Sequence, residues 1–347
     1  MTEPLATRRS VLQNAARMLA ATPLLYGATS LTQAQAQAAS GDWGKIVDAA
    51  KKEGAVTIYS AQGLTLLNDL ADRFKKEYGI QVNVVRAVDA ELIPRVETEL
   101  STGRGIADIF VAADEGGVRD RHAKGNVVAP QGPAMNNPAY DRKSRIPQGT
   151  YFESNAFVVA YGWNKELWPQ GIKDFKELLN PALTGKIGLP NPSVPALVDF
   201  YLFLEENNGG PEFTAKLATL KPRIYPGALP IGQALVSGEI SVAAYCQPLV
   251  DEIAKGAPVE WRIASRAWGA RFWVQILKTA PHPNAAQVLG NFMITQPGQE
   301  ALARNTASVL PGIGLTTTDK VHRQDLAKLT PDKVKAYQEN WRKMFIQ

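Results

Sequence analysis

Polar residues follow short apolar runs at several points along the chain, where a ligand could meet free hydrogen-bonding groups. In the first case, Ser60, Gln62 and Gly63 come directly after the apolar run Val56 to Tyr59, and a helical pattern begins at Leu64. The first N–H groups of a helix have no partner within it and carry partial positive charge, so such a loop favours an anion. The sequence therefore predicts a binding site for a small anionic ligand.

Two later segments have the same arrangement. Asp114 lies just past the buried strand expected over ADIFVAAD, and Tyr245 and Gln247 stand at the end of a strand expected from Ile240 to Tyr245. In a parallel sheet, ligands bind beyond the carboxyl ends of the strands, so these side chains are candidate ligand contacts. The alternative for Asp114 is structural, because aspartate is a common N-cap and the next helix is expected through Gly117 to His122.

Residues for covalent or metal chemistry are scarce. Cys246 is the only cysteine, which excludes an intrachain disulfide and disfavours a cysteine-based zinc site. A reactive thiolate needs a nearby base or a positive environment, and the histidines, His122, His282 and His322, lie outside the segments expected at the binding side. We therefore expect no enzyme activity, no metal and no cofactor, and we expect Cys246 to be a small buried residue.

The segment from Ala55 to Val84 positions the first loop. A strand over Val56 to Tyr59 is followed by a helix whose apolar stripe includes Leu67, Leu70 and Phe74, and then Ile80, Val82 and Val84 alternate with polar residues. A strand-helix-strand order predicts a parallel pair of strands with a right-handed crossover. The run from Pro226 to Tyr245 repeats this order, and a last amphipathic helix is expected from Pro331 to Phe345.

The amino terminus has the features of an export signal. Arg8 and Arg9 precede a mild apolar stretch from Met18 to Ala28, and small residues follow at 34, 36 and 38. We expect a twin-arginine signal peptide over residues 1–38 and a mature protein in the periplasm. Its removal lowers the formal net charge from +5 to +3, because it carries three arginines and one glutamate. The remaining Lys and Arg are scattered, so we expect no nucleic-acid partner.

The runs DWGKIVDAAKKEGAVTIYSAQ, TGRGIADIFVAAD and SGEISVAAYCQPLVDEIAKGAPVEW, in this order and spacing, resemble substrate-binding proteins of bacterial ABC transporters. The chain after residue 40 is most similar to the type II cluster that contains ferric-iron, phosphonate and thiamine binders. This resemblance implies an α/β fold of two lobes, each a mainly parallel sheet flanked by helices, that close on one ligand by a hinge motion. We expect lobe 1 at 41–156 and 266–325, lobe 2 at 157–265, and the C-terminal helix at 326–347 packed on a lobe.

The resemblance adds site residues and partners. It implies that Ser154 and Asn155 face the cleft and that Asn191 and Ser193 line the ligand unless they serve only as N-caps. Arg266 or Arg271 is a further candidate, because a guanidinium group can hold an anion. It also implies an inner-membrane ABC permease as partner of a monomeric binding protein.

The ferric-iron members bind the metal through a tyrosine pair, which would fall here on Pro248 and Leu249, and often through a histidine, which would fall on or near Gly63. Since these signatures are absent, an organic or phosphorus-containing anion is expected. Ferric iron remains the alternative. A cleft-cysteine enzyme using Cys246 is a further alternative, because a thiamine-cleaving enzyme shares the fold.

Overall fold

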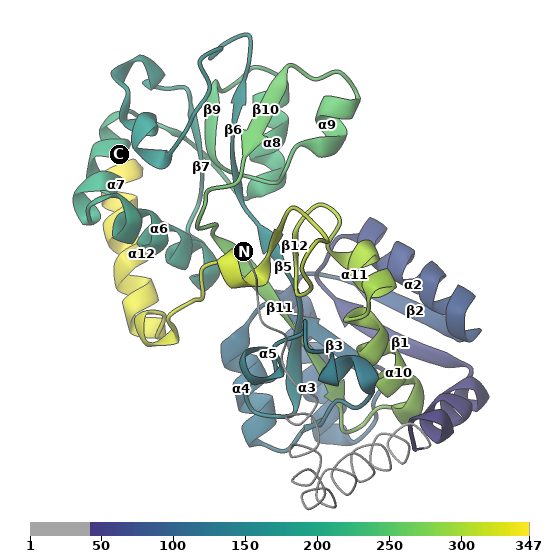
Figure 1. Ribbon diagram of the computed structural model, residues 1–347. Helices are drawn as coiled ribbons and strands as arrows, with labels where there is room; N and C mark the ends of the chain where they lie inside the picture. The colour runs from purple at the N-terminus through teal and green to yellow at the C-terminus, as the bar shows by residue number, and fades with distance from the viewer. Residues whose placement is uncertain (1–41, 347) are drawn as a thin grey trace, which may run out of the picture.

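The computed structural model describes residues 42–346, which form two lobes joined by a hinge (Figure 1). The expected signal peptide at 1–38 lies outside the described residues. Within 42–346, no helix is long and apolar enough to cross a membrane. Each lobe is built on one sheet, and helices flank both sheets, so the expected two-lobed α/β architecture is confirmed.

The first lobe contains an eight-stranded sheet with the order β13-β12-β5-β11-β3-β1-β2, in which β4 also pairs with β11. The pairs β1·β2 and β1·β3 are parallel, whereas β11 runs antiparallel to β3 and β5, so the sheet is mixed and not mainly parallel as expected. The strands are β1 (Ala55–Ser60), β2 (Gln81–Arg86), β3 (Ile109–Ala112), β4 (Val127–Val128), β5 (Tyr151–Val158), β11 (Gly269–Leu277), β12 (Ala307–Ser308) and β13 (Thr316–Thr317).

Helices cover this sheet and bury its two faces in separate cores. Ile58 packs in one core and its neighbour Tyr59 packs in the other, because successive side chains of a strand point to opposite faces. The helices are one at 42–53, α2 (Leu64–Tyr78), α3 (Asp89–Thr102), α4 (Glu115–Ala123), α5 (Arg142–Arg145), α10 (Pro283–Met293) and α11 (Gln296–Leu302), with a 3-10 turn, η1 (Pro133–Asn136).

The predicted strand-helix-strand unit is confirmed as β1-α2-β2. Leu67, Leu70 and Phe74 are the buried residues of α2, as its periodicity indicates. The helix ends at Gly79, which has φ 75°, a conformation that glycine adopts at least cost. β2 then pairs in register with β1, from Ala55 opposite Gln81 to Ser60 opposite Arg86. The loop from 61 to 63 therefore lies at the carboxyl edge of the sheet.

The second lobe contains a five-stranded sheet with the order β10-β6-β9-β7-β8, also mixed in direction. Its strands are β6 (Ala160–Asn164), β7 (Ile187–Pro190), β8 (Arg223–Tyr225), β9 (Val242–Cys246) and β10 (Val259–Arg262). Its helices are α6 (Pro195–Asn208), α7 (Pro211–Thr219), α8 (Ala228–Val236) and α9 (Val250–Ala254), with 3-10 turns η2 (Phe175–Leu179) and η3 (Pro181–Leu183).

The chain crosses between the lobes where strands of one sheet continue toward the other. β5 pairs with β11 in the first sheet as far as Val158, and β6 begins in the second sheet at Ala160. The expected boundary after residue 156 therefore falls inside β5. The chain returns at Gly269, and η4 (Thr318–Lys320) and η5 (Leu326–Lys328) lead to the last helix.

The C-terminal helix α12 (Pro331–Phe345) packs on the second lobe beside α6 and α7 (Figure 1). Trp341 is fully buried, its ring lies 5.8 Å from that of Tyr201 in α6, and it stacks on Phe345 at 4.7 Å. Apolar burial thus holds α12 on the second lobe, although the strands that precede it in the sequence belong to the first lobe.

Candidate ligand-binding cleft

A cleft of about 410 Å³ lies between the lobes. The first lobe supplies the loop before α2, the start of α2, β5, β11 and the segment after α11, and the second lobe supplies the end of β9 and the start of α9. The lining residues are Ala61, Gln62, Gly63, Leu66, Asn155, Phe157, Phe272, Asn305 and Thr306, with Gln247, Pro248, Asp251 and Glu252 opposite. A ligand of metabolite size fits such a volume.

Two buried amides form the floor of the cleft. Gln62 Nε2 donates to Asn155 Oδ1 at 2.7 Å, which joins residues 93 positions apart in the chain. Asn155 Nδ2 in turn donates to the carbonyl of Leu302 at 3.2 Å. Both side chains are almost fully buried, at 2% and 1% exposure. The floor is therefore fixed before a ligand arrives.

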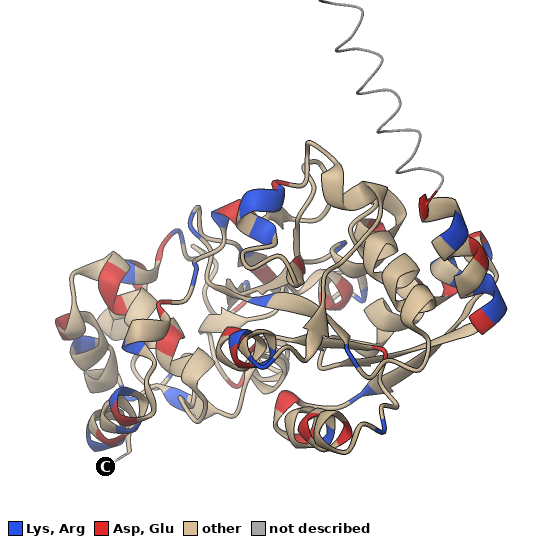
Figure 2. Cartoon of the chain, turned by 90° about the horizontal axis from the view of Figure 1, so that it is seen from below, with Lys and Arg blue, Asp and Glu red and all other residues tan. Residues whose placement is uncertain are grey.

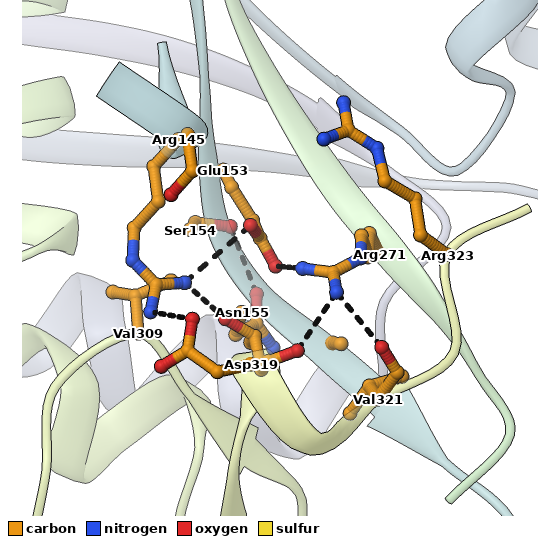
Figure 3. Close-up of polar contacts among 12 residues, drawn as sticks. Arg145, Glu153, Ser154, Asn155, Arg271, Val309, Asp319, Val321 and Arg323 are labelled. Carbon is orange, nitrogen blue, oxygen red and sulfur yellow. Dashed lines mark hydrogen bonds and ion pairs between the residues drawn. The ribbon is translucent and has the colours of Figure 1, made fainter. Parts of the chain in front are cut away.

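Two serines hold these amides from behind. The backbone N–H of Gln62 donates to Ser60 Oγ at 3.1 Å, and Ser154 Oγ donates to Asn155 Oδ1 at 2.8 Å. Ser154 and Asn155 lie next to each other on β5 in Figure 3. The structure thus brings together the predicted residues Ser60, Gln62, Gly63, Ser154 and Asn155, although the two serines position the amides and do not line the cleft.

Gly63 and Leu66, at the amino terminus of α2, line the same cleft. The carbonyl of its N-cap, Gly63, accepts from the N–H groups of Leu66 and Leu67. No side chain caps this end and no acidic residue lies in the first turn. Among the described residues, the N–H groups of Gly63, Leu64 and Thr65 have no hydrogen-bond partner. These groups can donate hydrogen bonds to an anionic group, which the helix dipole also favours.

The second-lobe wall carries carboxylates that sequence reasoning missed. Asp251 and Glu252 line the cleft beside the predicted Gln247, whose Nε2 lies 3.5 Å from Glu252 Oε1. Both lie in the first turn of the short helix α9. Their closeness to Gln247 in the sequence could have indicated them, because residues five or six positions after the end of β9 still lie at the edge of the sheet.

The other predicted residues do not line this cleft. Asp114 is the exposed N-cap of α4, but its side chain makes no capping hydrogen bond. Asn191 and Ser193 do not cap α6 either, because that helix begins at Pro195 with Val194 as its N-cap. Arg266 is exposed and lies outside the lining.

Tyr245 also packs away from the cleft, in the core of the second lobe. Its ring lies 4.8 Å from Phe200 and 5.7 Å from Trp268, and burial raises the pKa of its hydroxyl. A neutral, buried phenol is a poor ligand for a ferric ion. At the positions where the resemblance places the iron-binding tyrosines, Pro248 lines the cleft and Leu249 is fully buried.

Arg271 lies outside the lining of the cleft and is occupied by structural contacts (Figure 3). Its guanidinium donates to Glu153 Oε1 at 2.6 Å and to the carbonyls of Thr318 and Val321 at 2.8 and 2.9 Å. Arg145 lies on the other side of Glu153, 3.4 Å from Oε2. Arg271 therefore fixes η4 to the first lobe and is not free to hold a ligand.

Cys246 is fully buried, and desolvation raises the pKa of its thiol. Its sulfur lies 3.4 Å from the carbonyl oxygen of Ala160, which is no base for thiolate formation. Within residues 42–346, no group of three or more His, Cys, Asp or Glu side chains could hold a metal ion.

Comparison with solved structures places this architecture among periplasmic binding proteins. Iron-bound HitA from Pseudomonas aeruginosa is similar at 18% identity, with 83% of this chain and 99% of that chain covered and a TM-score of 0.66. The periplasmic binding protein AfuA from Actinobacillus pleuropneumoniae, with fructose-6-phosphate bound, is similar at 17% identity, with 84% and 98% covered and a TM-score of 0.61.

The apo ferric ion-binding protein A of Pasteurella haemolytica is similar at 17% identity, with 84% and 96% covered and a TM-score of 0.60. At these identities the likeness shows the fold. The sequence also matches the family model of the bacterial extracellular solute-binding protein over residues 56–305. The chain with this two-lobed fold and inter-lobe cleft therefore belongs to the bacterial extracellular solute-binding protein family.

Proposed function

We propose that this chain is the periplasmic binding component of an ABC uptake transporter and that it captures a small ligand with an anionic group. The observation that carries the proposal is the uncapped amino terminus of α2, whose free N–H groups open on a cleft with a fixed amide floor. The lobes would close on the ligand by a hinge motion and present it to an inner-membrane permease.

The amino-terminal sequence supports export by the twin-arginine route, through Arg8 and Arg9. The mature protein would then act as a monomer in the periplasm. Lys and Arg are interspersed with Asp and Glu over the helices (Figure 2), and for this reason we propose no nucleic-acid partner. Replacement of both arginines with lysine should leave unprocessed precursor in the cytoplasm, and a periplasmic fraction that still contains the protein would exclude this route.

The first experiment is a thermal-shift screen of residues 40–347 against phosphate, phosphonates, carboxylates, sugar phosphates and ferric citrate. A ligand at a thousandfold excess over its Kd adds about 4 kcal/mol of stability, enough to raise the melting temperature by several degrees. A shift with an anion and none with iron is expected. A shift with ferric citrate alone would instead support an iron binder, as the similar HitA is solved with iron bound.

The role of the helix amino terminus is tested by Leu64→Pro. Leu64 is the first residue of α2 and is 52% exposed, and Gly63 before it is extended with φ −60° and ψ 133°, so proline fits without breaking the helix. The change deletes one free N–H. A lost hydrogen bond to a charged group should weaken anion binding by about tenfold to a hundredfold. Leu64→Ala, which keeps the N–H, is the matched control and should bind nearly as the wild type.

A further inference from the structure

The two walls of the cleft differ in charge. The first-lobe wall offers the free N–H groups of α2, whereas the second-lobe wall offers the carboxylates of Asp251 and Glu252. Within residues 42–346, no Lys, Arg or His lines the cleft to neutralise them. Among the described residues, neither carboxylate takes part in an ion pair within 4 Å, and the only side-chain hydrogen bond of Glu252 is the long one from Gln247. Both carboxylates are therefore available to a ligand.

Two half-buried phenyl rings complete the site between these walls. Phe157 follows Asn155 on β5, and Phe272 lies on β11, so both come from the strands nearest the hinge. The face of an aromatic ring attracts an organic cation, and carboxylates beside such a ring strengthen this preference. The middle of the cleft and its second-lobe wall thus share a preference for positive charge.

A purely structural role explains only part of this arrangement. Acidic side chains in the first turn stabilise a helix by complementing its dipole, by about 0.3–1 kcal/mol each. That role requires a place near the start of α9, but it does not require that both carboxylates line the cleft. A ligand with only negative charge would bring that charge toward Asp251 and Glu252 when the lobes close, which is unfavourable.

The geometry points to a ligand that carries an ammonium or similar organic cation in addition to its anionic group. The anionic group lies at the amino terminus of α2, and the cation lies between Asp251 and Glu252 and the phenyl rings. This inference rests on the proposed function, because it assigns the chemical class of the ligand in the same cleft. Each lobe then recognises one end of a zwitterion, so that only a molecule with both charges favours closure.

The test compares residues 40–347 with the double variant D251N/E252Q. Each protein is incubated with a bacterial metabolite extract, separated from unbound molecules by gel filtration and denatured, and the released molecules are identified by mass spectrometry. The wild type should retain a species with a basic nitrogen and an acidic group. The double variant should retain at least about tenfold less of this species than the wild type. The control is Glu212→Gln, a first-turn carboxylate of α7 that is 84% exposed and outside the cleft, which should retain the species like the wild type.

Calorimetry on the identified species and its N-acetyl derivative completes the test. Acetylation removes the positive charge, so the wild type should lose affinity for the derivative, while the double variant should bind both forms with similar weak affinity. A retained species without a basic nitrogen, or equal retention by wild type and double variant, would refute the zwitterion and leave the solute-binding role intact. If the folded wild type retains nothing, the proposed function fails and this inference fails with it.

Discussion

Replacing Glu153 with glutamine should destabilise the protein more than any other single change of charge in the cluster of Figure 3. Glu153 is 2% exposed and lies between Arg271, 14% exposed, and Arg145, 3% exposed. Glutamine keeps the shape but removes the only buried negative charge between two guanidinium groups. Breaking a buried ion pair from one side costs about 3–5 kcal/mol, because the remaining charges are left uncompensated.

Asp319→Asn is the matched control, because it removes a carboxylate from the same cluster at a different depth. Asp319 lies 2.9 Å from Arg145, closer than Glu153 does, but is 66% exposed. Solvent screens such a pair, so its loss should cost about 1 kcal/mol or less. The expected difference between the two variants therefore comes from the burial of Glu153 and from its second arginine partner, Arg271 at 2.6 Å.

The assay is equilibrium unfolding in urea, followed by circular dichroism, since guanidinium chloride would screen the charges under test. The midpoint for Glu153→Gln should fall well below those of the wild type and Asp319→Asn, with a similar slope. A loss under about 1 kcal/mol for Glu153→Gln, or equal losses for both variants, would refute the reasoning that burial of this charge cluster stabilises the first lobe.

Three other outcomes are expected. Trp341→Ala should cost about 3–5 kcal/mol in the same unfolding assay, because the ring is fully buried against the second lobe, whereas Lys335→Ala on the exposed side of α12 should cost little. Native protein should react slowly with iodoacetamide near pH 7 and rapidly in urea, since burial raises the pKa of Cys246; rapid native labelling would revive the enzyme alternative. For Glu99, desolvation would raise the pKa, but the N–H groups of Ala107 and Ile106, with Tyr59 and Arg95, lower it below its usual 4.5. Its stabilising contribution is therefore present above pH 4.5 and is lost as the pH falls through the lower folded-state pKa. The free energy of unfolding of Glu99→Gln should therefore fall less between pH 5 and 3 than that of the wild type. An equal fall for both proteins would contradict this assignment.

Local periodicity predicted the parts of the fold that are local. The stripe of Leu67, Leu70 and Phe74 fixes α2, and the alternation after Gly79 fixes β2, because each pattern spans one element. The loop with Gln62 followed from the rule that ligands meet the carboxyl ends of parallel strands. Its partner Asn155 lies on a strand buried on both faces, which carries no alternating pattern, and only the resemblance to a known family pointed to it.

The predictions that miss the cleft depended on where a side chain points. All five residues of β9 are buried, so alternation could not tell that Tyr245 faces Phe200 and Trp268 while Gln247, beyond the strand, faces the cleft. Asn191 and Ser193 have the right chemistry for an N-cap, but Pro195 favours the first position of a helix and makes Val194 the N-cap. Residue type indicated the function of these loops, and backbone geometry decided which residues perform it.

The two walls of the cleft also differ in how firmly they are held, and this difference bears on the order of binding. The first-lobe wall is fixed through β5: the carbonyl of Ser154 accepts from Gln299 Nε2 at 2.7 Å, while Gln299 Oε1 accepts from Ser308 Oγ at 2.8 Å. The second-lobe wall rests on α9, a helix of five residues with no buried side chain. Preorganised groups lose little entropy on binding, whereas a loosely held wall must be ordered by the ligand. We therefore expect the ligand to bind first at the amide floor and α2, and the carboxylates of α9 to engage as the lobes close.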